Sequence, residues 1–217
     1  MKKCVYCGER EANTNDHIPP ICLFPVPRPS NLITVPCCTI CNGKYGQDDE
    51  QIRNILTFLG STENHPAIVN QIANKRDRSF KKKGGESKLE YLINNSVLVD
   101  FHTKGGIYLG KKSAFNFDNP MWDKFFNRMA RGLLHHENSF GYVECTTDWK
   151  KLEENITPED VPEDLKIAIQ YGKLVIIGDN IFQYIGCFHP SIITSLWFLI
   201  FYGGVVFKVM IKEEASG

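Results

Sequence analysis

The stretch CVYCGEREANTNDHIPPICLFPVPRPSNLITVPCCTICN, residues 4–42, decides how the first part of this chain folds. It begins and ends with a Cys-x-x-Cys pair. A gap of two residues lets both thiolates of a pair face one ion, and four sulfurs complete a tetrahedral zinc site. Cys37 competes with its neighbour Cys38, and the spacing of the pair favours Cys38. We therefore expect a structural Zn²⁺ bound by Cys4, Cys7, Cys38 and Cys41.

The composition of the chain is that of an ordinary folded protein. It has 217 residues, 42% of them hydrophobic, which is enough to bury a core. The formal net charge is zero, so attraction to phosphates must come from a local patch. No apolar stretch follows the lysines of the N-terminal MKKCVYCG. We therefore expect no secretory signal, a cytoplasmic protein, and cysteines that bind metal rather than form disulfides.

One long uncharged run, IITSLWFLIFYGGVVF at residues 192–207, raises the question of a membrane segment. It is slightly short for a spanning helix, and Gly203-Gly204 lies inside it. A glycine pair between β-branched and aromatic runs is typical of a hairpin. We expect two buried antiparallel strands here and no contact with a membrane.

The rest of the chain predicts an α+β fold. We expect a small zinc-stapled module, residues 1–60, packed on an accessory domain of helices and antiparallel strands, residues 61–217. The apolar spacing predicts a helix capped at Asp48, a second helix from about Asn64, and a third, with a buried stripe, capped by Asp118 or Asn119. SVLVDF and GIYLG indicate a hairpin, and four C-terminal strands follow an acidic segment, residues 148–164, expected at the surface. Gly132, inside the third helix, indicates a close packing partner.

The strongest basic cluster is KRDRSFKKKGGESK, residues 75–88. Clustered lysines and arginines bind phosphate groups without reading sequence, although such a cluster is also typical of a solvated helix end. Two arginines on the polar side of the third helix are further candidates. The candidate nucleic-acid contacts are Lys75, Arg76, Arg78, Lys81, Lys82, Lys83, Arg128 and Arg131.

A second set of polar residues is interleaved with the cysteines: Asp16-His17, Asn31, and Asn42 directly after the last cysteine. An isolated Asp-His pair carries little information. In this combination, an imidazole with a pKa near neutrality is suited to take a proton from water, and oxygen ligands are suited to hold a hard divalent cation.

With CVYCG, DHIPP, SNLITVPCCTICN and the trailing Lys44, residues 4–50 resemble the HNH endonuclease family. That resemblance implies a ββα-metal fold, in which a β-hairpin and a helix surround a metal ion. It implies that His17 is the general base, that Asp16 and Asn42 bind a catalytic Mg²⁺ or another divalent cation such as Mn²⁺ or Ni²⁺, and that Asn31 braces the loop and orients His17.

The resemblance implies a metal-dependent phosphodiester hydrolase acting on nucleic acid, and we expect DNA. The chain departs from the family where CLFPVPRPS replaces a common Gly-Gly pair, and where Asn42 stands in place of a histidine. Two alternatives stay open: a non-catalytic zinc module that binds nucleic acid or protein, and a degenerate nuclease unit with a regulatory role. Residues 61–217 are expected to position substrate, to set specificity, or to bind a protein partner or a second copy of the chain.

Overall fold

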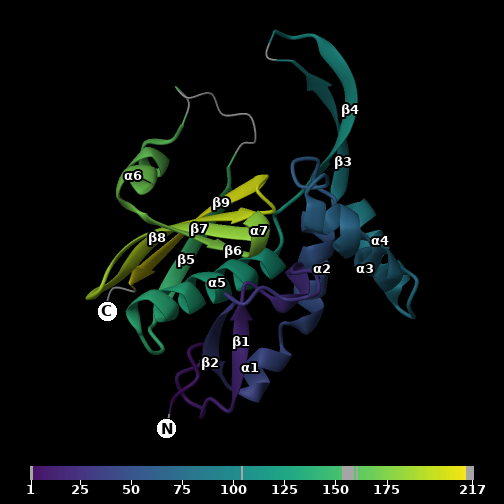
Figure 1. Cartoon of the computed structure of the whole chain (residues 1–217). Helices are drawn as coiled ribbons and strands as arrows, with labels where there is room; N and C mark the ends of the chain where they lie inside the picture. Colours follow the sequence, from purple (N-terminus) through teal and green to yellow (C-terminus); the bar gives the residue numbers. More distant parts are fainter. Residues whose placement is uncertain (1, 104, 153–158, 160, 214–217) are drawn as a thin grey trace.

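The computed structural model describes residues 2–103, 105–152, 159 and 161–213. It shows a mixed α/β protein with antiparallel sheets and a cluster of four cysteines near the N-terminus (Figure 1). The first sheet is a hairpin of β1 (Thr14–Ile18) and β2 (Ile33–Cys37). A short 3-10 turn, η1 (Ile21–Leu23), lies in the connection between the two strands.

Two helices follow the first hairpin almost without a break. They are α1 (Thr39–Gly43) and α2 (Gly46–Leu56). The second begins two residues before Asp48, so the expected cap at that residue is wrong, and Asp48 and Asp49 lie in its first turn instead. Acidic side chains there interact favourably with the N-terminal end of the helix dipole.

The middle of the chain forms a helical group and a projecting hairpin. A π-helical turn, η2 (Ile68–Ile72), leads into α3 (Ala73–Phe80), and α4 (Gly85–Asn94) follows. The predicted hairpin is confirmed as β3 (Ser96–His102) and β4 (Tyr108–Phe115). In Figure 1 it extends away from the body of the molecule as a separate two-stranded arm.

The longest helix, α5 (Pro120–Asn138), lies at the centre of the fold. Its cap is Asn119, whose side chain accepts a hydrogen bond from the Met121 backbone N–H at 2.8 Å. The apolar stripe predicted from the sequence is buried along most of the helix. This helix packs against the β1/β2 hairpin on one side and against the C-terminal sheet on the other (Figure 1).

The C-terminal sheet has five antiparallel strands in the order β5-β9-β8-β7-β6. The four expected C-terminal strands are confirmed, and β8 and β9 account for the uncharged run. The fifth strand, β5, covers residues that the sequence had placed partly in an acidic surface segment. Residues 153–158 and 160 of that segment lie outside the described residues. The strands are β5 (Cys145–Lys151), β6 (Lys173–Ile177), β7 (Phe182–His189), β8 (Ile192–Phe201) and β9 (Val205–Glu213).

Each face of the sheet has its own cover. Trp197, Leu199 and Phe201 of β8 belong to the main core, which α5 shares, while Phe198 packs in a smaller cluster with Ala168 of α6 (Glu163–Tyr171). The short α7 (Gly178–Ile181) joins β6 to β7. The main core also includes buried residues of the β1/β2 hairpin, so hydrophobic packing is continuous from that hairpin to the sheet. Among the described helices, none has the length and apolarity needed to cross a membrane.

Candidate metal centre and its surroundings

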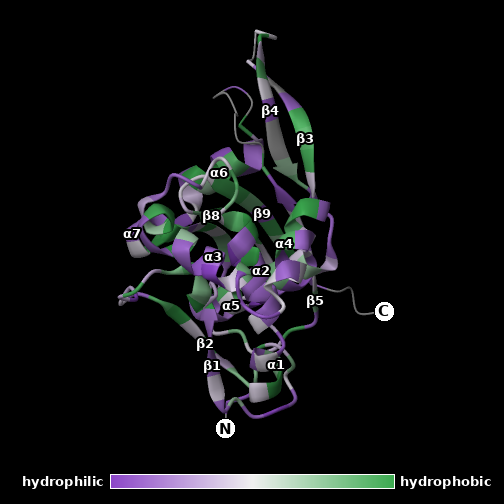
Figure 2. Cartoon of the chain, turned by 90° about the vertical axis from the view of Figure 1, so that its right-hand side faces the viewer, coloured by the Kyte–Doolittle hydropathy of each residue, from purple (hydrophilic) through white to green (hydrophobic). Residues whose placement is uncertain are grey.

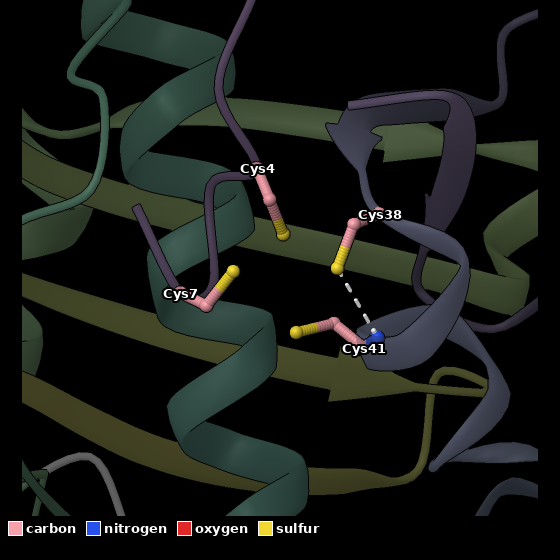
Figure 3. Close-up of side chains that lie close together, drawn as sticks. All are labelled: Cys4, Cys7, Cys38 and Cys41. Atoms are coloured by element: carbon pink, nitrogen blue, oxygen red, sulfur yellow. Dashed lines mark hydrogen bonds between the residues drawn. The ribbon is translucent and has the colours of Figure 1, made fainter. Parts of the chain in front are cut away.

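The four cysteines of the two pairs converge on one point. The sulfurs of Cys4, Cys7, Cys38 and Cys41 all lie within 4.8 Å of one another, and Figure 3 shows them directed toward a common centre. Four thiolates at this spacing are a set that tetrahedral zinc binds. The donor set therefore fits a structural metal ion such as Zn²⁺.

The local backbone explains how the two pairs meet. Around the first pair, a tight turn is closed by a 2.9 Å bond from the Gly8 N–H to the Cys4 carbonyl, with Gly8 at a φ of 64°. A further bond from the Val5 N–H to the Pro36 carbonyl, at 3.1 Å, ties this turn to β2. The second pair follows β2 directly: β2 ends at Cys37, Cys38 caps α1, and Cys41 lies within α1. The hairpin thus brings together two cysteine pairs that are separated by 30 residues of sequence.

The thiols of the centre differ in their ionisation. Burial opposes the charged form of Cys7, but hydrogen bonds from the backbone N–H groups of Arg10 and Glu9 outweigh it and lower its pKa to about 7. The Cys41 N–H, 3.4 Å from the Cys38 sulfur, lowers the pKa of Cys38. Cys37 lies outside the group; burial raises its pKa, and its thiol donates to the Cys38 carbonyl at 3.3 Å. The choice of Cys38 over Cys37 is therefore supported by the placement of the sulfurs.

Asp16 lies on the inner face of β1 and is only 3% exposed. Both of its oxygens are engaged by one guanidinium: Nε of Arg128 is 2.6 Å from Oδ2, and Nη2 is 2.6 Å from Oδ1. The Tyr6 hydroxyl also donates to Oδ2, at 2.7 Å. Burial, with the Asp16 carboxylate next in importance, raises the pKa of Tyr6 well above its usual value.

Arg128 therefore has a different place from the one expected. It is 3% exposed rather than on the polar side of its helix, so its assignment as a phosphate contact is wrong. Its Nη1 donates to Asp49 Oδ1 at 2.6 Å, and its guanidinium lies 4.3 Å from the centroid of the Tyr45 ring. Burial works against its charge, but the hydrogen bonds to Asp16 and the nearby carboxylate of Asp49 outweigh burial and raise its pKa. The guanidinium is a buried cation shared by two carboxylates.

The expected catalytic cation does not fit these residues as they stand. A ligand needs oxygen lone pairs directed at the ion, but Asp16 is buried, its Oδ2 accepts from both Tyr6 and Arg128, and its Oδ1 and its charge are paired with Arg128. The side chain of Asn42 is directed to the start of β1, where Nδ2 donates to Thr14 Oγ1 at 3.2 Å and to the Asn15 carbonyl at 3.3 Å. We therefore derive no step through a metal ion at Asp16 and Asn42.

His17 and Asn31 do not contact one another through a hydrogen bond. Since successive side chains of a strand point to opposite faces, the half-buried His17 faces away from the side that carries Asp16. The imidazole makes no hydrogen bond to any part of the chain that the structure describes. Asn31 instead bonds the C-terminal sheet: its Nδ2 donates to the Ile176 carbonyl at 2.9 Å, and its Oδ1 accepts from the Gly178 N–H at 3.4 Å. It braces the loop, as expected, but against β6 rather than against His17.

The remaining basic candidates fall into two groups. Two are held by protein groups: Arg76 donates to the Thr57 carbonyl at 2.9 Å, and Arg131 donates to Asn127 Oδ1 at 2.9 Å and to the Cys145 carbonyl at 3.2 Å. The others make no ion pair with a described residue. This second group consists of Lys75, which is half-buried, and the exposed Arg78, Lys81, Lys82 and Lys83.

Sequence reasoning did not single out Arg53 or Tyr6. Arg53 is 2% exposed and lies in a hollow beside the basic cluster. Its position in an apolar helical repeat, between Ile52 and Ile55, was the available signal, since a charged residue there must find a polar partner.

Comparison of the chain with known protein families, with curated proteins and with solved structures found no match.

Proposed function

We propose that this chain is an HNH-type nuclease in which a zinc-stapled hairpin and helix present His17 to a phosphodiester bond in DNA. The observation that carries the proposal is the order of the elements. The first knuckle is followed by a strand bearing Asp16 and His17, a second strand, and a short helix bearing the last cysteine and Asn42. This is the arrangement that the resemblance to the HNH family implies.

The role proposed for His17 is that of a general base. An imidazole with a pKa near neutrality can take a proton from water, and His17 is neither fully buried nor engaged in a hydrogen bond among the described residues. The expected divalent cation, Mg²⁺ or Mn²⁺ or Ni²⁺, would stabilise the charge that develops on the phosphate. Asp16 is not proposed as a ligand of this cation, because its carboxylate is paired with Arg128.

The pairing of Asp16 is the observation that favours a second function, a non-catalytic zinc module that binds nucleic acid. A carboxylate that holds a buried arginine contributes to the fold without any reaction. In that case the module would bind nucleic acid without turnover at any concentration of divalent cation.

The test is a cleavage panel over supercoiled plasmid, single-stranded DNA and RNA, each with Mg²⁺, Mn²⁺, Ni²⁺ or a chelator. The nuclease proposal expects cutting of DNA that needs added cation and is lost in His17→Ala while zinc content and thermal unfolding stay unchanged. His136→Ala is the matched control, because His136 is an exposed histidine at the far end of α5. Full cutting by His17→Ala overturns the role of His17, and binding without cutting under every condition favours the zinc module.

A further inference from the structure

A hollow of about 530 Å³ lies beside α2. Its walls come from α2, from η2 and α3, and from the loop that follows η1. Figure 2 shows α3, which forms one wall, coloured largely as hydrophilic. The charged residues in the wall are Glu50, Arg53, Lys75, Arg78 and Lys82.

The charge in this hollow is not balanced. Four cations face one carboxylate, and that carboxylate is already occupied: Glu50 pairs with Lys88 and lies 3.4 Å from Arg53 Nη2. In the part of the chain that the structure describes, Lys75, Arg78 and Lys82 have no acidic side chain within 4.0 Å. The hollow is therefore electropositive.

Two of the cations are held inside rather than free in water. Arg53 is fixed by hydrogen bonds from Nε and Nη2 to Asn54 Oδ1, at 3.2 and 2.7 Å, and from Nη2 to Ser79 Oγ at 3.3 Å. Its Nη1 has no hydrogen-bond partner among the described residues. Lys75 is half-buried beside it; burial first, and then repulsion by Arg53, lower the pKa of Lys75. Bringing such like charges together is unfavourable unless an anion joins them.

The outer cations line up with the inner ones through the geometry of α3. Lys75, Arg78 and Lys82 are spaced by three and four residues, which places them along one side of the helix and the turn that follows it. An arginine fork and two flexible ammonium groups are the donors that proteins use for phosphate oxygens. The ligand chemistry indicated is that of a phosphate.

The neighbouring surface favours an extended phosphate ligand over a compact one. A second hollow adjoins the first at Glu50 and runs between α2, α4 and the start of α5. Its wall carries three lysines, Lys83, Lys88 and Lys124, beside the acidic Asp48 and Glu50, and Lys88 is paired with Glu50. The two hollows follow α2, which begins four residues after Asn42. A chain of phosphates can occupy both hollows, whereas a single small anion fills only one.

We propose that this hollow binds the phosphodiester backbone of a nucleic acid, with Arg53 and Lys75 as its inner anchors and Arg78 and Lys82 at its mouth. The choice of nucleic acid rests on the proposed function. The inference that the hollow binds phosphate groups rests only on the placement of the cations, so it can be tested without measuring cleavage.

The experiment measures the affinity of fluorescently labelled duplex and single-stranded oligonucleotides at several salt concentrations, in EDTA at a level that leaves zinc bound. The test variant is Lys75→Glu with Lys82→Glu, and the matched control is Lys111→Glu with Lys212→Glu, which removes the same charge from exposed sites elsewhere. We expect the test variant to bind about tenfold more weakly or worse, and its plot of log affinity against log salt to lose about two units of slope. The control pair should lose markedly less of both, and zinc content should be the same in all three proteins.

Equal losses of affinity and salt slope in the test and control variants would overturn the proposal that this hollow binds nucleic acid. Failure of the unmodified protein to bind either oligonucleotide would overturn it as well. A nucleoside triphosphate that binds in a Lys75-dependent way while oligonucleotides do not would overturn the choice of nucleic acid. Loss of cleavage in His17→Ala without loss of oligonucleotide affinity supports both proposals. Binding through the hollow by a protein that never cuts supports the hollow and rejects the nuclease.

Discussion

Arg128 of α5 and Asp16 of β1 form a two-point ion pair, with both nitrogen-to-oxygen distances at 2.6 Å, inside the protein. One helical turn further, Gly132 of α5 lies against Ile18 of β1. Four helical residues advance about 6 Å and two strand residues about 6.6 Å, so the spacing of the two contacts along α5 matches their spacing along β1. The β1/β2 hairpin is thus fixed to the rest of the chain by a polar contact and a steric contact side by side.

Asp16→Asn tests whether this carboxylate is chiefly structural. The change leaves Arg128 buried with only Asp49 to neutralise it, and removing one partner of a buried pair costs about 3–5 kcal/mol. We expect the free energy of unfolding, measured in urea with zinc present, to fall by roughly that amount. Asp148→Asn, at an exposed position of β5, is the control and should change it by less than about 0.5 kcal/mol. If Asp16→Asn kept full stability and lost only cleavage, Asp16 would be a ligand rather than a brace.

The second carboxylate of the group predicts a pH dependence. Burial, opposed by Arg128, raises the pKa of Asp49 to about 6 from its ordinary 3.8. The folded chain then binds this proton more tightly than the unfolded chain, so Asp49 makes stability fall as the pH rises from about 4 to about 6. Asp49→Asn should remove that contribution from a plot of unfolding free energy against pH. A plot for Asp49→Asn that runs parallel to that of the unmodified protein across this range would contradict the raised pKa.

The choice between adjacent cysteines can be tested by matched substitutions. Cys38→Ser removes one sulfur from the group of four, and we expect bound zinc, measured by mass spectrometry of the metal, to fall well below one ion per chain. Cys37→Ser removes a buried sulfur that is outside the group and leaves a hydroxyl able to bond the same carbonyl, so zinc should stay near one ion per chain. Zinc retained by Cys38→Ser and lost by Cys37→Ser would reverse the assignment.

Removal of the metal should loosen the hairpin before the sheet. Strong chelation leaves the Cys4–Cys7 turn and α1 held by the packing of Val5 in the main core and by hydrogen bonds such as that from the Val5 N–H to the Pro36 carbonyl. We expect amide hydrogen exchange to rise first in residues 2–43 and later in β7, β8 and β9. Uniform exchange across the chain after zinc removal would show that the centre stabilises the whole fold equally.

Much of the fold could be read from the sequence because its signals are local. The spacing of the cysteines predicted which sulfurs meet, the glycine pair at 203–204 predicted the turn between β8 and β9, and the apolar stripe predicted α5. In each case the pattern and the structure that it specifies lie within one or two elements. The strand β5 was missed because it lies at the edge of the sheet and carries mostly polar side chains.

The candidate site was harder to predict because its contacts are distant in sequence. Asp16 was assigned from its neighbour His17, but its environment is set by Arg128, 112 residues away. The sequence held one hint, since Arg128 stands three residues after Phe125 and four before Gly132 and so lies on the apolar stripe rather than beside it. Nothing local indicates which buried acid such an arginine meets.

Gly132→Ala tests the steric half of the contact between hairpin and helix. A methyl group at this position would lie 2.6 Å from Cγ1 of Ile18, which is too close without movement of one element. Alanine favours a helix by about 1 kcal/mol over glycine, so a gain in stability is expected if the position is free. We instead expect a net loss of about 1–3 kcal/mol, because overpacking in the core outweighs that gain.

Gly46→Ala, at the start of α2 with open space around it, is the control and should be neutral or stabilising. Ile18→Ala combined with Gly132→Ala should recover part of the loss relative to the sum of the single changes, as measured in a double-mutant cycle. Strict additivity of the two changes would show that Ile18 and Gly132 do not press on one another.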